Sequence, residues 1–525
     1  MIYLTADIGS TYTKLVATDI GLGKVIGTSC AFTTIETDVR EGFNNALSNM
    51  EAKIGKFSYD KLICCSSAAG GLKMVALGLV PELTAKAARL TATSAGAKVV
   101  KTYSFEISRA EQEEIYEINP DLVLLCGGTD GGNKDVIISN ARRLCQIDRD
   151  FSVIVAGNKS ASHELQKIFT NPGNLANQNL GNSAQQVPED SFNQELGGSD
   201  NYFPKDFVIT QNVMPEFNKL NIEPARKCIE ELFISRIVQA KGLSALQEMS
   251  GHEIIPTPLA VMRACELLSR GVSDAEGKGV EDSTVNCKEF EDLTVKGKGV
   301  EDSTKSEELS GLGDLIAVDL GGATTDIYSM AEGKPTASNV LCKGLPEPYA
   351  KRSVEGDLGM RYSLSALAQE AGVDKIAKEA NLSKEKVEGW IEKCCANPDI
   401  VTTKDSLEQK IEEAIAKVAV EIATDRHAGI IESVYTPMGQ MFALTGKDLS
   451  EVPVIIGIGG AITNSVDPAK ILSGAKYNSA RYMYSKPKDP SYMMDSKYVF
   501  ASMGLLGDID KVTALKILKE EINKI

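Results

Sequence analysis

The chain has 525 residues, of which 43% are hydrophobic and 24% are charged, with 45 Gly against 18 Pro. This length exceeds what one compact core holds, and the composition is typical of a globular protein with several folding units rather than a disordered one. The formal charge of −16 argues against a nucleic-acid or anionic-membrane surface, because phosphate binding needs a basic footprint.

The sequence also argues against a membrane span, a disulfide scaffold and a histidine site. No apolar run approaches the roughly 20 residues that cross a bilayer, and no basic region precedes a hydrophobic stretch at the N-terminus, so we expect a cytoplasmic protein. Eleven cysteines are too sparse for a disulfide framework, and none forms a C-x-x-C pair. His163, His252 and His427 occur in unrelated contexts, which disfavours a metal site or a catalytic triad.

Short apolar stretches alternate with amphipathic stretches of helix length along the whole chain, which predicts α/β units. A helix is predicted from Asn221 onward, where Pro224 takes a first-turn position that costs no hydrogen bond. The strands near 121, 152 and 207 predict a small α/β subdomain, about 115–220, inserted in the first part of the chain. The predicted strands are, in chain order, 2–7, 61–65, 121–126, 152–156, 207–210, 315–319 and 452–458.

Two polar segments interrupt this pattern. Residues 171–205 are rich in Asn, Gln, Gly and Ser, which predicts a long surface loop. Residues 271–310 contain an eight-residue stretch, Gly-Lys-Gly-Val-Glu-Asp-Ser-Thr, that recurs letter for letter. It lacks the spacing of a phosphate loop and a preceding strand, so a low-complexity insertion is the better interpretation. It divides the chain into an N-terminal part, 1–270, and a C-terminal part, 311–525.

Each part begins with the same motif, an apolar predicted strand that ends in Asp and is followed by a turn of Gly and hydroxyl residues. The first is Asp7-Ile-Gly-Ser-Thr-Tyr-Thr-Lys14 and the second is Asp319-Leu-Gly-Gly-Ala-Thr-Thr-Asp326. A Gly-led turn exposes backbone N–H groups to phosphate oxygens, and two carboxylates can hold hydrated Mg²⁺. One such turn also occurs in ordinary loops. Two, each opening a separate part of the chain, predict a site for a nucleoside triphosphate.

Two further glycine-rich stretches follow predicted strands. The strand at 452–458 runs into Gly459 and Gly460, where missing side chains would let the backbone approach a flat adenosine, although a plain strand-to-helix turn is the alternative. The loop from Gly127 to Asn133 contains Asp130. An anion or partner site and a structural turn remain equal alternatives for this loop.

The three motifs at 7–14, 319–326 and 457–461 resemble the phosphate-1, phosphate-2 and adenosine motifs of the actin, heat-shock chaperone and sugar-kinase superfamily, in that family's order. The resemblance implies two ribonuclease-H-like, actin-like ATPase lobes around a nucleotide cleft with ATP and Mg²⁺. It implies Mg²⁺ at Asp7 and Asp319, and it makes Asp7, Asp319 and Asp326 the catalytic candidates. The residues implied to bind the nucleotide are Gly9, Ser10, Thr11, Lys14, Gly321, Gly322, Thr324, Gly457, Gly459 and Gly460.

A narrower resemblance covers nearly the whole chain. The stretches 124–133, 256–262 and 318–326 together are similar to the glutamate mutase L family, which is unrelated to the DNA-repair protein of similar name. Its members are accessory proteins of adenosylcobalamin-dependent mutases. The resemblance implies an ATP-driven, chaperone-like reactivating factor with such a mutase as protein partner, and leaves a homo-oligomer open. The alternatives are a small-molecule kinase, an activator of 2-hydroxyacyl-CoA dehydratases and an actin-type filament.

Overall fold

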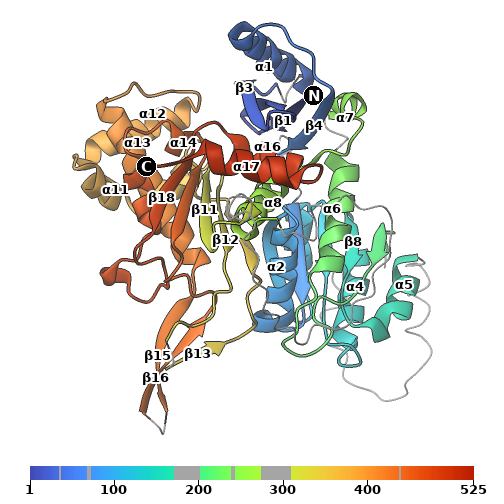
Figure 1. Ribbon diagram of the computed structural model, residues 1–525. Coiled ribbons are helices and arrows are strands. Elements are labelled where there is room, and N and C mark those ends of the chain that lie inside the picture. Colours follow the sequence, from blue (N-terminus) through green and yellow to red (C-terminus); the bar gives the residue numbers. More distant parts are fainter. Residues whose placement is uncertain are drawn as a thin grey trace, which may run out of the picture.

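The computed structural model describes residues 1–34, 37–67, 73–170, 202–237, 243–272, 309–337, 339–436 and 439–525. The predicted α/β class is confirmed. The described chain forms two lobes, each built on a mixed sheet, and a parallel five-stranded sheet inserted in the first lobe (Figure 1). The predicted polar loop and repeat insertion lie almost wholly outside the described residues.

The sheet of the first lobe has the strand order β10-β4-β1-β2-β3. Strands β1, β2 and β3 form an antiparallel meander, and β4 and β10 then add in parallel beside β1. Helices α1 and α7 pack against this sheet (Figure 1). The bounds are β1 Ile2–Ile8, β2 Tyr12–Asp19, β3 Lys24–Phe32, α1 Val39–Ile54, β4 Lys61–Ser66, α7 Leu243–Ser250 and β10 Ile255–Pro256.

The sheet of the second lobe repeats this arrangement. Its order is β14-β12-β11-β17-β18-β19, with an antiparallel meander of β11, β12 and β14 followed by the parallel strands β17 and β18. The predicted pair of ribonuclease-H-like lobes is therefore confirmed. The strand bounds are β11 Leu315–Leu320, β12 Thr325–Met330, β14 Ala350–Glu355, β17 Val454–Ile458, β18 Ser491–Asp495 and β19 Ile522–Lys524.

The inserted subdomain is a parallel sheet with the order β6-β5-β7-β8-β9, the doubly wound arrangement 2-1-3-4-5. It begins at Lys73, well before the boundary near 115 that the sequence suggested, because β5 and β6 pair with β7. Helices α2 and α6 pack together on one face, and α4 and α5 on the other. The bounds are β5 Lys73–Gly78, α2 Lys86–Ser94, β6 Lys98–Ser104, α3 Arg109–Ile118, β7 Leu122–Leu125, α4 Asp135–Cys145, β8 Ser152–Val155, α5 Ser162–Thr170, β9 Phe207–Ile209 and α6 Glu223–Ile237.

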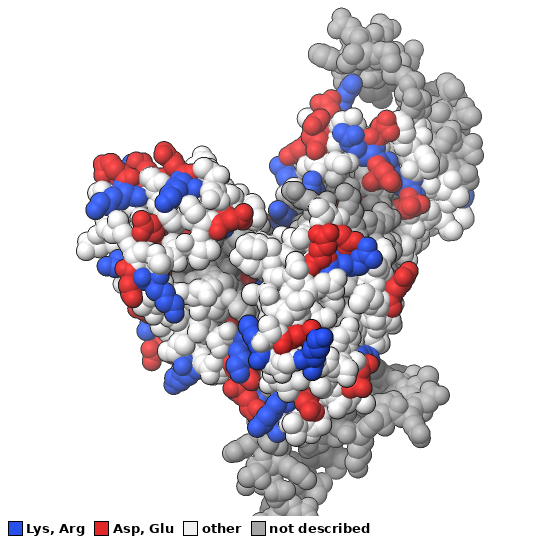
Figure 2. Space-filling view, turned by 90° about the horizontal axis from the view of Figure 1, so that it is seen from above, with Lys and Arg blue, Asp and Glu red and all other residues white. Residues whose placement is uncertain are grey.

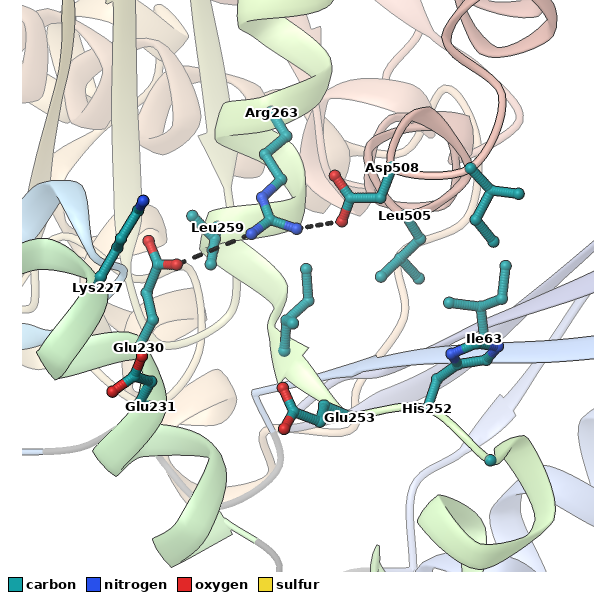
Figure 3. A pocket seen from close by; sticks show the side chains of 13 residues that line it. Ile63, Lys227, Glu230, Glu231, His252, Glu253, Leu259, Arg263, Leu505 and Asp508 are labelled. Atoms are coloured by element: carbon teal, nitrogen blue, oxygen red, sulfur yellow. Dashed lines mark hydrogen bonds and ion pairs between the residues drawn. The ribbon is translucent and has the colours of Figure 1, made fainter. Parts of the chain in front are cut away.

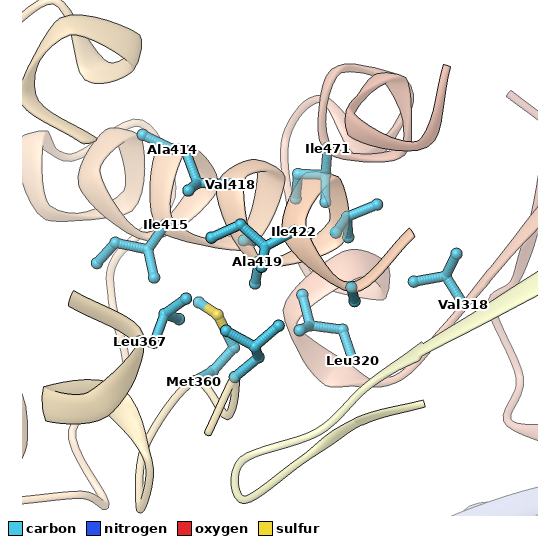
Figure 4. Close-up of a cluster of buried hydrophobic side chains, with 14 of the residues drawn as sticks. Val318, Leu320, Met360, Leu367, Ala414, Ile415, Val418, Ala419, Ile422 and Ile471 are labelled. Carbon is cyan, nitrogen blue, oxygen red and sulfur yellow. The ribbon is translucent and has the colours of Figure 1, made fainter. Parts of the chain in front are cut away.

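Side chains alternate between two cores in the second-lobe sheet, as the two-residue period of a strand requires. In β11, Ile316, Val318 and Leu320 face a core that α13 covers (Figure 4), whereas Leu315 and Ala317 face a core shared by both lobes. By the same alternation, Asp319 lies on the face of β11 that is turned toward the first lobe. The helices over the first core are α10 Leu364–Ala371, α11 Val373–Ala380, α12 Lys384–Ala396, α13 Leu407–His427, α14 Gly460–Thr463 and α15 Pro468–Leu472.

Two helices cross between the lobes and fill the shared core. These are α8, Thr257–Arg270, and α16, Val499–Gly507, with α17, Lys511–Glu521, packed on both (Figure 1). At their crossing a Cβ on Gly504 would lie 1.8 Å from the carbonyl oxygen of Ala260. Only glycine permits this approach, so Gly504 fixes how closely the two helices pack.

Two surface features complete the fold. A three-stranded arm of β13 Val340–Lys343, β15 Ile430–Thr436 and β16 Gly439–Thr445 projects from the second lobe (Figure 1). On the face that Figure 2 shows, the described Lys and Arg side chains are interspersed with Asp and Glu. No helix among the described residues is both long and apolar enough to cross a membrane.

Lys447 is a fully buried lysine near the base of the arm. Its ammonium donates to the carbonyl oxygens of Tyr349 at 2.6 Å and Ser329 at 3.1 Å, and to the Ser329 hydroxyl at 3.2 Å. None of these acceptors is a carboxylate. Burial, with a smaller contribution from the Lys351 ammonium, lowers the pKa of Lys447 to about 7. Protonated Lys447 therefore weakens the folded state.

Replacement of Lys447 tests this effect. Above the folded-state pKa of about 7 and below the ordinary value of 10.5, the unfolded chain keeps a proton that the folded chain has lost. Raising the pH in this window therefore stabilises the wild type, by up to about 1.4 kcal/mol per pH unit. We expect the denaturation midpoint of the wild type to rise with pH relative to that of Lys447→Met. Lys334→Met, at a lysine 79% exposed, should show no such trend; parallel curves for Lys447→Met would contradict the expectation.

Candidate functional site

The two Asp-Gly turns are equivalent β-hairpin turns at the inner ends of the two lobe sheets. In the first, the Gly9 amide donates to the Tyr12 carbonyl at 3.1 Å; in the second, the Gly321 amide donates to the Thr324 carbonyl at 2.9 Å. Asp7 pairs in register with Lys14, and Asp319 with Asp326. The same local backbone therefore presents one carboxylate from each lobe.

Asp7 is held from three directions. It alternates with Ala6 and Ile8, which face the outer core, so it lies on the side of β1 toward the shared core. The Thr257 hydroxyl, at the start of α8, donates to Asp7 Oδ1 at 2.6 Å, and the Cys65 thiol lies 3.6 Å from the same oxygen. The Lys14 ammonium lies 3.6 Å from Oδ2.

Asp319 and Lys14 show that the two hairpins converge. Burial alone would lower the pKa of Lys14, but Asp7 and then Asp319 hold it above its usual value. Burial raises the pKa of Asp319 to about 7, helped by Asp326 and Asp7 and opposed by Lys14 and Arg352. Asp7 and Asp319, which come from opposite lobes, therefore repel each other, and both attract the Lys14 ammonium. An added cation would relieve this repulsion.

Asp326, the third predicted carboxylate, is an ion-pair partner in this structure. The Arg352 guanidinium donates to its Oδ1 through Nε at 2.8 Å and Nη2 at 2.5 Å, and the Thr324 hydroxyl donates to its Oδ2 at 3.0 Å. Both charged side chains are buried. These hydrogen bonds fix the orientation of the Asp326 carboxylate, so in this structure Asp326 holds the second hairpin in place through Arg352.

The glycine-rich end of β17 packs directly on the second hairpin. Gly459 has φ +99°, and a Cβ there would lie 2.4 Å from the Leu320 carbonyl oxygen. Beside it, the Tyr498 hydroxyl is 2.7 Å from the Thr463 hydroxyl, and the Tyr498 ring lies 4.9 Å from the Lys14 ammonium. Tyr498 therefore connects the β17 turn of the second lobe with the lysine of the first.

The remaining predicted nucleotide-binding residues divide by exposure. Ser10 is exposed, and Gly9, Thr11, Gly321, Gly322 and Thr324 are half-buried, so parts of both turns are accessible from outside. Gly457 is buried against Ile462 and Leu472, so it packs the β17 turn rather than facing the cleft. Three residues that sequence reasoning missed, Thr257, Arg352 and Tyr498, contact the predicted ones.

The site fits Mg²⁺ when phosphate oxygens complete the coordination shell. Among the described residues, no group of three or more His, Cys, Asp or Glu side chains is placed to hold a metal ion alone. Mg²⁺ typically takes one or two carboxylates and shares the rest of its shell between phosphate and water. Asp7 and Asp319 supply such a pair of carboxylates.

A separate pocket of about 550 Å³ lies outside this cleft, between α6, α8 and the turn after α16 (Figure 3). Arg263 crosses it from α8, with Glu230 of α6 at 3.8 Å on one side and Asp508 on the other. Arg263 pairs with both carboxylates, and Arg226 of α6 lies 3.6 Å from the other oxygen of Glu230. Their position indicates a structural tie between the subdomain and the crossing helices.

The contrast between Gly459 and its neighbour gives a test of the β17 turn. Gly459→Ala should lower the free energy of unfolding by about 1–3 kcal/mol, because its Cβ would overlap the Leu320 carbonyl at a positive φ. In Gly460→Ala the nearest atoms to the new Cβ are 3.6 and 3.7 Å away, an ordinary contact, so stability should change little. Thermal denaturation of both variants is the measurement, and equal melting temperatures would contradict this account.

Comparisons with known proteins place this geometry in context. The family model described as MutL protein matches residues 3–178, 202–285 and 296–522. Protein MutL of Clostridium tetanomorphum is 40% identical over 528 residues, covering 100% of this chain and 99% of that protein.

Two solved structures are more distantly similar. A nucleotide-free acetone carboxylase matches with a TM-score of 0.38 and 12% identity, over 96% of this chain and 70% of that one. The activator of the 2-hydroxyisocaproyl-CoA dehydratase from Clostridium difficile, with bound ADPNP, matches with a TM-score of 0.27 and 9% identity, over 100% of this chain and 99% of that one. The family assignment rests on the sequence relatives, and by that evidence this chain belongs to the MutL protein family, as its resemblance to glutamate mutase L predicted.

Proposed function

We propose that this protein binds and hydrolyses ATP with Mg²⁺ between its lobes and thereby assists an adenosylcobalamin-dependent mutase, such as glutamate (methylaspartate) mutase or an aminomutase. The observation that carries the ATP part is the position of Lys14, whose ammonium lies 3.6 Å from Asp7 in the first hairpin and 4.9 Å from the ring of Tyr498, which contacts the glycine turn packed on the second hairpin. Membership of the MutL family supports the mutase part.

Each residue of the cleft has a role in this proposal. Asp7 and Asp319 would hold Mg²⁺, which would supply neutralisation of the phosphate charge. Lys14 binds phosphate oxygens, and the two glycine turns present backbone N–H groups to them. Thr257 orients Asp7 through its short hydrogen bond. Because phosphoryl transfer depends mainly on positioning and charge neutralisation, this set needs no nucleophilic side chain.

Replacement of either carboxylate tests the ATP site. Asp7→Asn and Asp319→Asn should each reduce Mg²⁺-dependent ATP hydrolysis by about 100-fold or more, because each removes a charge that faces the metal and leaves a side chain of the same shape. Calorimetric titration with a non-hydrolysable ATP analogue and a phosphate-release assay would measure binding and turnover. Asp374→Asn is the matched control, because the Asp374 side chain lies on α11 of the second lobe and is 82% exposed.

Two outcomes would contradict the proposal. Unchanged hydrolysis in both Asn variants would remove the assigned site. Formation of ADP only when a sugar or organic acid is added would indicate a small-molecule kinase, whereas hydrolysis with water as the acceptor is expected for an accessory ATPase.

A reactivation assay tests the mutase part. The mutase from the same organism, inactivated by turnover until its cobalamin is damaged, should regain activity when it receives this protein, ATP, Mg²⁺ and fresh adenosylcobalamin. The expected physical basis is a change in lobe separation between ATP-bound and product-bound states. Asp7→Asn should fail to restore turnover. Equal recovery with and without ATP, or no recovery, would overturn the mutase role while leaving the ATP site standing.

A further inference from the structure

Helix α2 belongs to the inserted subdomain, yet it lies along β14, the edge strand of the second-lobe sheet (Figure 1). At its start, Lys86 pairs with Glu347 of the second lobe at 2.7 Å, and Lys351 pairs with the same carboxylate at 3.2 Å. The Glu347 side chain is only 4% exposed. The subdomain is therefore joined by covalent connections to one lobe and by buried charges to the other.

The C-terminal end of α2 makes a second connection to the same lobe. The Thr93 carbonyl accepts a hydrogen bond from Arg352 Nη1 at 3.2 Å and another from the Gly96 amide at 3.1 Å. Carbonyl groups in the last turn of a helix lack helical donors and carry the negative end of the helix dipole. A buried guanidinium here stabilises that turn.

Arg352 also makes the fork to Asp326 in the second hairpin. One planar side chain thus holds both the hairpin that carries Asp319 and the end of a subdomain helix. Because the guanidinium presents its donors in a rigid fork, a displacement of Asp326 must move Arg352 relative to Thr93 or break one of these hydrogen bonds.

The same end of α2 also approaches the first hairpin. A Cβ on Gly96 would lie 3.2 Å from the Pro256 Cβ, and Pro256 precedes Thr257, the donor to Asp7. The end of α2 therefore contacts Arg352, which holds Asp326 of the second hairpin, and Pro256, the residue before the donor to Asp7. A ligand that draws the two hairpins together would therefore shift the contacts of this turn with Arg352 and with Pro256.

We propose that Arg352 is a positioning residue that couples the cleft to the inserted subdomain: occupation of the cleft by Mg-nucleotide changes the protection of the last turn of α2 through Asp326, Arg352 and Thr93. This inference rests on the proposed ATP site and adds to it the element that reports nucleotide state. The subdomain is then the part of the molecule through which a partner protein would sense that state.

Hydrogen–deuterium exchange measured by mass spectrometry tests the coupling. In the wild type, a saturating non-hydrolysable Mg-ATP analogue should slow exchange in residues 91–97 by about threefold or more relative to the free protein. In Arg352→Lys, the single ammonium can pair with Asp326 but cannot also fork to Thr93. This variant should keep the wild-type melting temperature within a few degrees and lose most of the exchange response.

The controls separate this inference from the function on which it rests. Arg352→Gln should lose both the response and part of the stability, whereas Arg481→Gln, which breaks ion pairs with Glu421 and Asp425 elsewhere in the second lobe, should keep the response. Calorimetry on the wild type is done first, and an absence of nucleotide binding would overturn the ATP site and the coupling with it. Binding without any change in residues 91–97, or a full response in Arg352→Lys, would overturn the coupling alone.

Discussion

The close crossing of α8 and α16 is the constraint on which the arrangement of this molecule depends. Gly504 lies against the backbone of Ala260, and around this point the sheets of both lobes share one apolar core. The helices also deliver residues to the cleft. Thr257 opens α8 and donates to Asp7, while Tyr498 precedes α16 and lies beside Lys14. Packing between the lobes and geometry within the cleft are therefore set by the same contact.

The two lobes repeat one topology, but the residue that pairs with the first aspartate of each hairpin has a different charge in each lobe. In the first hairpin the residue opposite the aspartate is Lys14, and in the second it is Asp326. Two like charges in register on neighbouring strands repel each other. Arg352 compensates on the far side of Asp326, and it can do so because β14 is the next strand of the meander. The asymmetry places one half-buried cation, Lys14, beside the first aspartate and one buried cation, Arg352, behind the second hairpin.

The sequence allowed prediction of those features that depend on a short-range pattern of residues. Strands such as β1 and β11 are marked by apolar runs, and their terminal aspartates by the glycine turns that follow, so both Asp-Gly turns could be found without a structure. The strands that complete the hairpins, β2 and β12, were not predicted. The start of the subdomain could not be predicted either, because the apolar run of β5 does not reveal that it pairs with β7, and β6 is partly exposed and carries Lys98 and Lys101. Thr257 and Arg352 were missed for another reason. They reach the cleft through contacts between elements distant in the chain, which no local spacing reveals.

The order of strands also determines when each part can form as the chain leaves the ribosome. All five strands of the inserted subdomain lie between β4 and β10, so this sheet has its full set of partners before the first lobe has its last strand. The shared core needs α16 and α17, near the end of the chain. Contacts of such long sequence separation form late and slowly. The core between the lobes is thus the last part that synthesis completes, and a chain that stops before α16 has every strand of the subdomain sheet but lacks the helices that join the lobes.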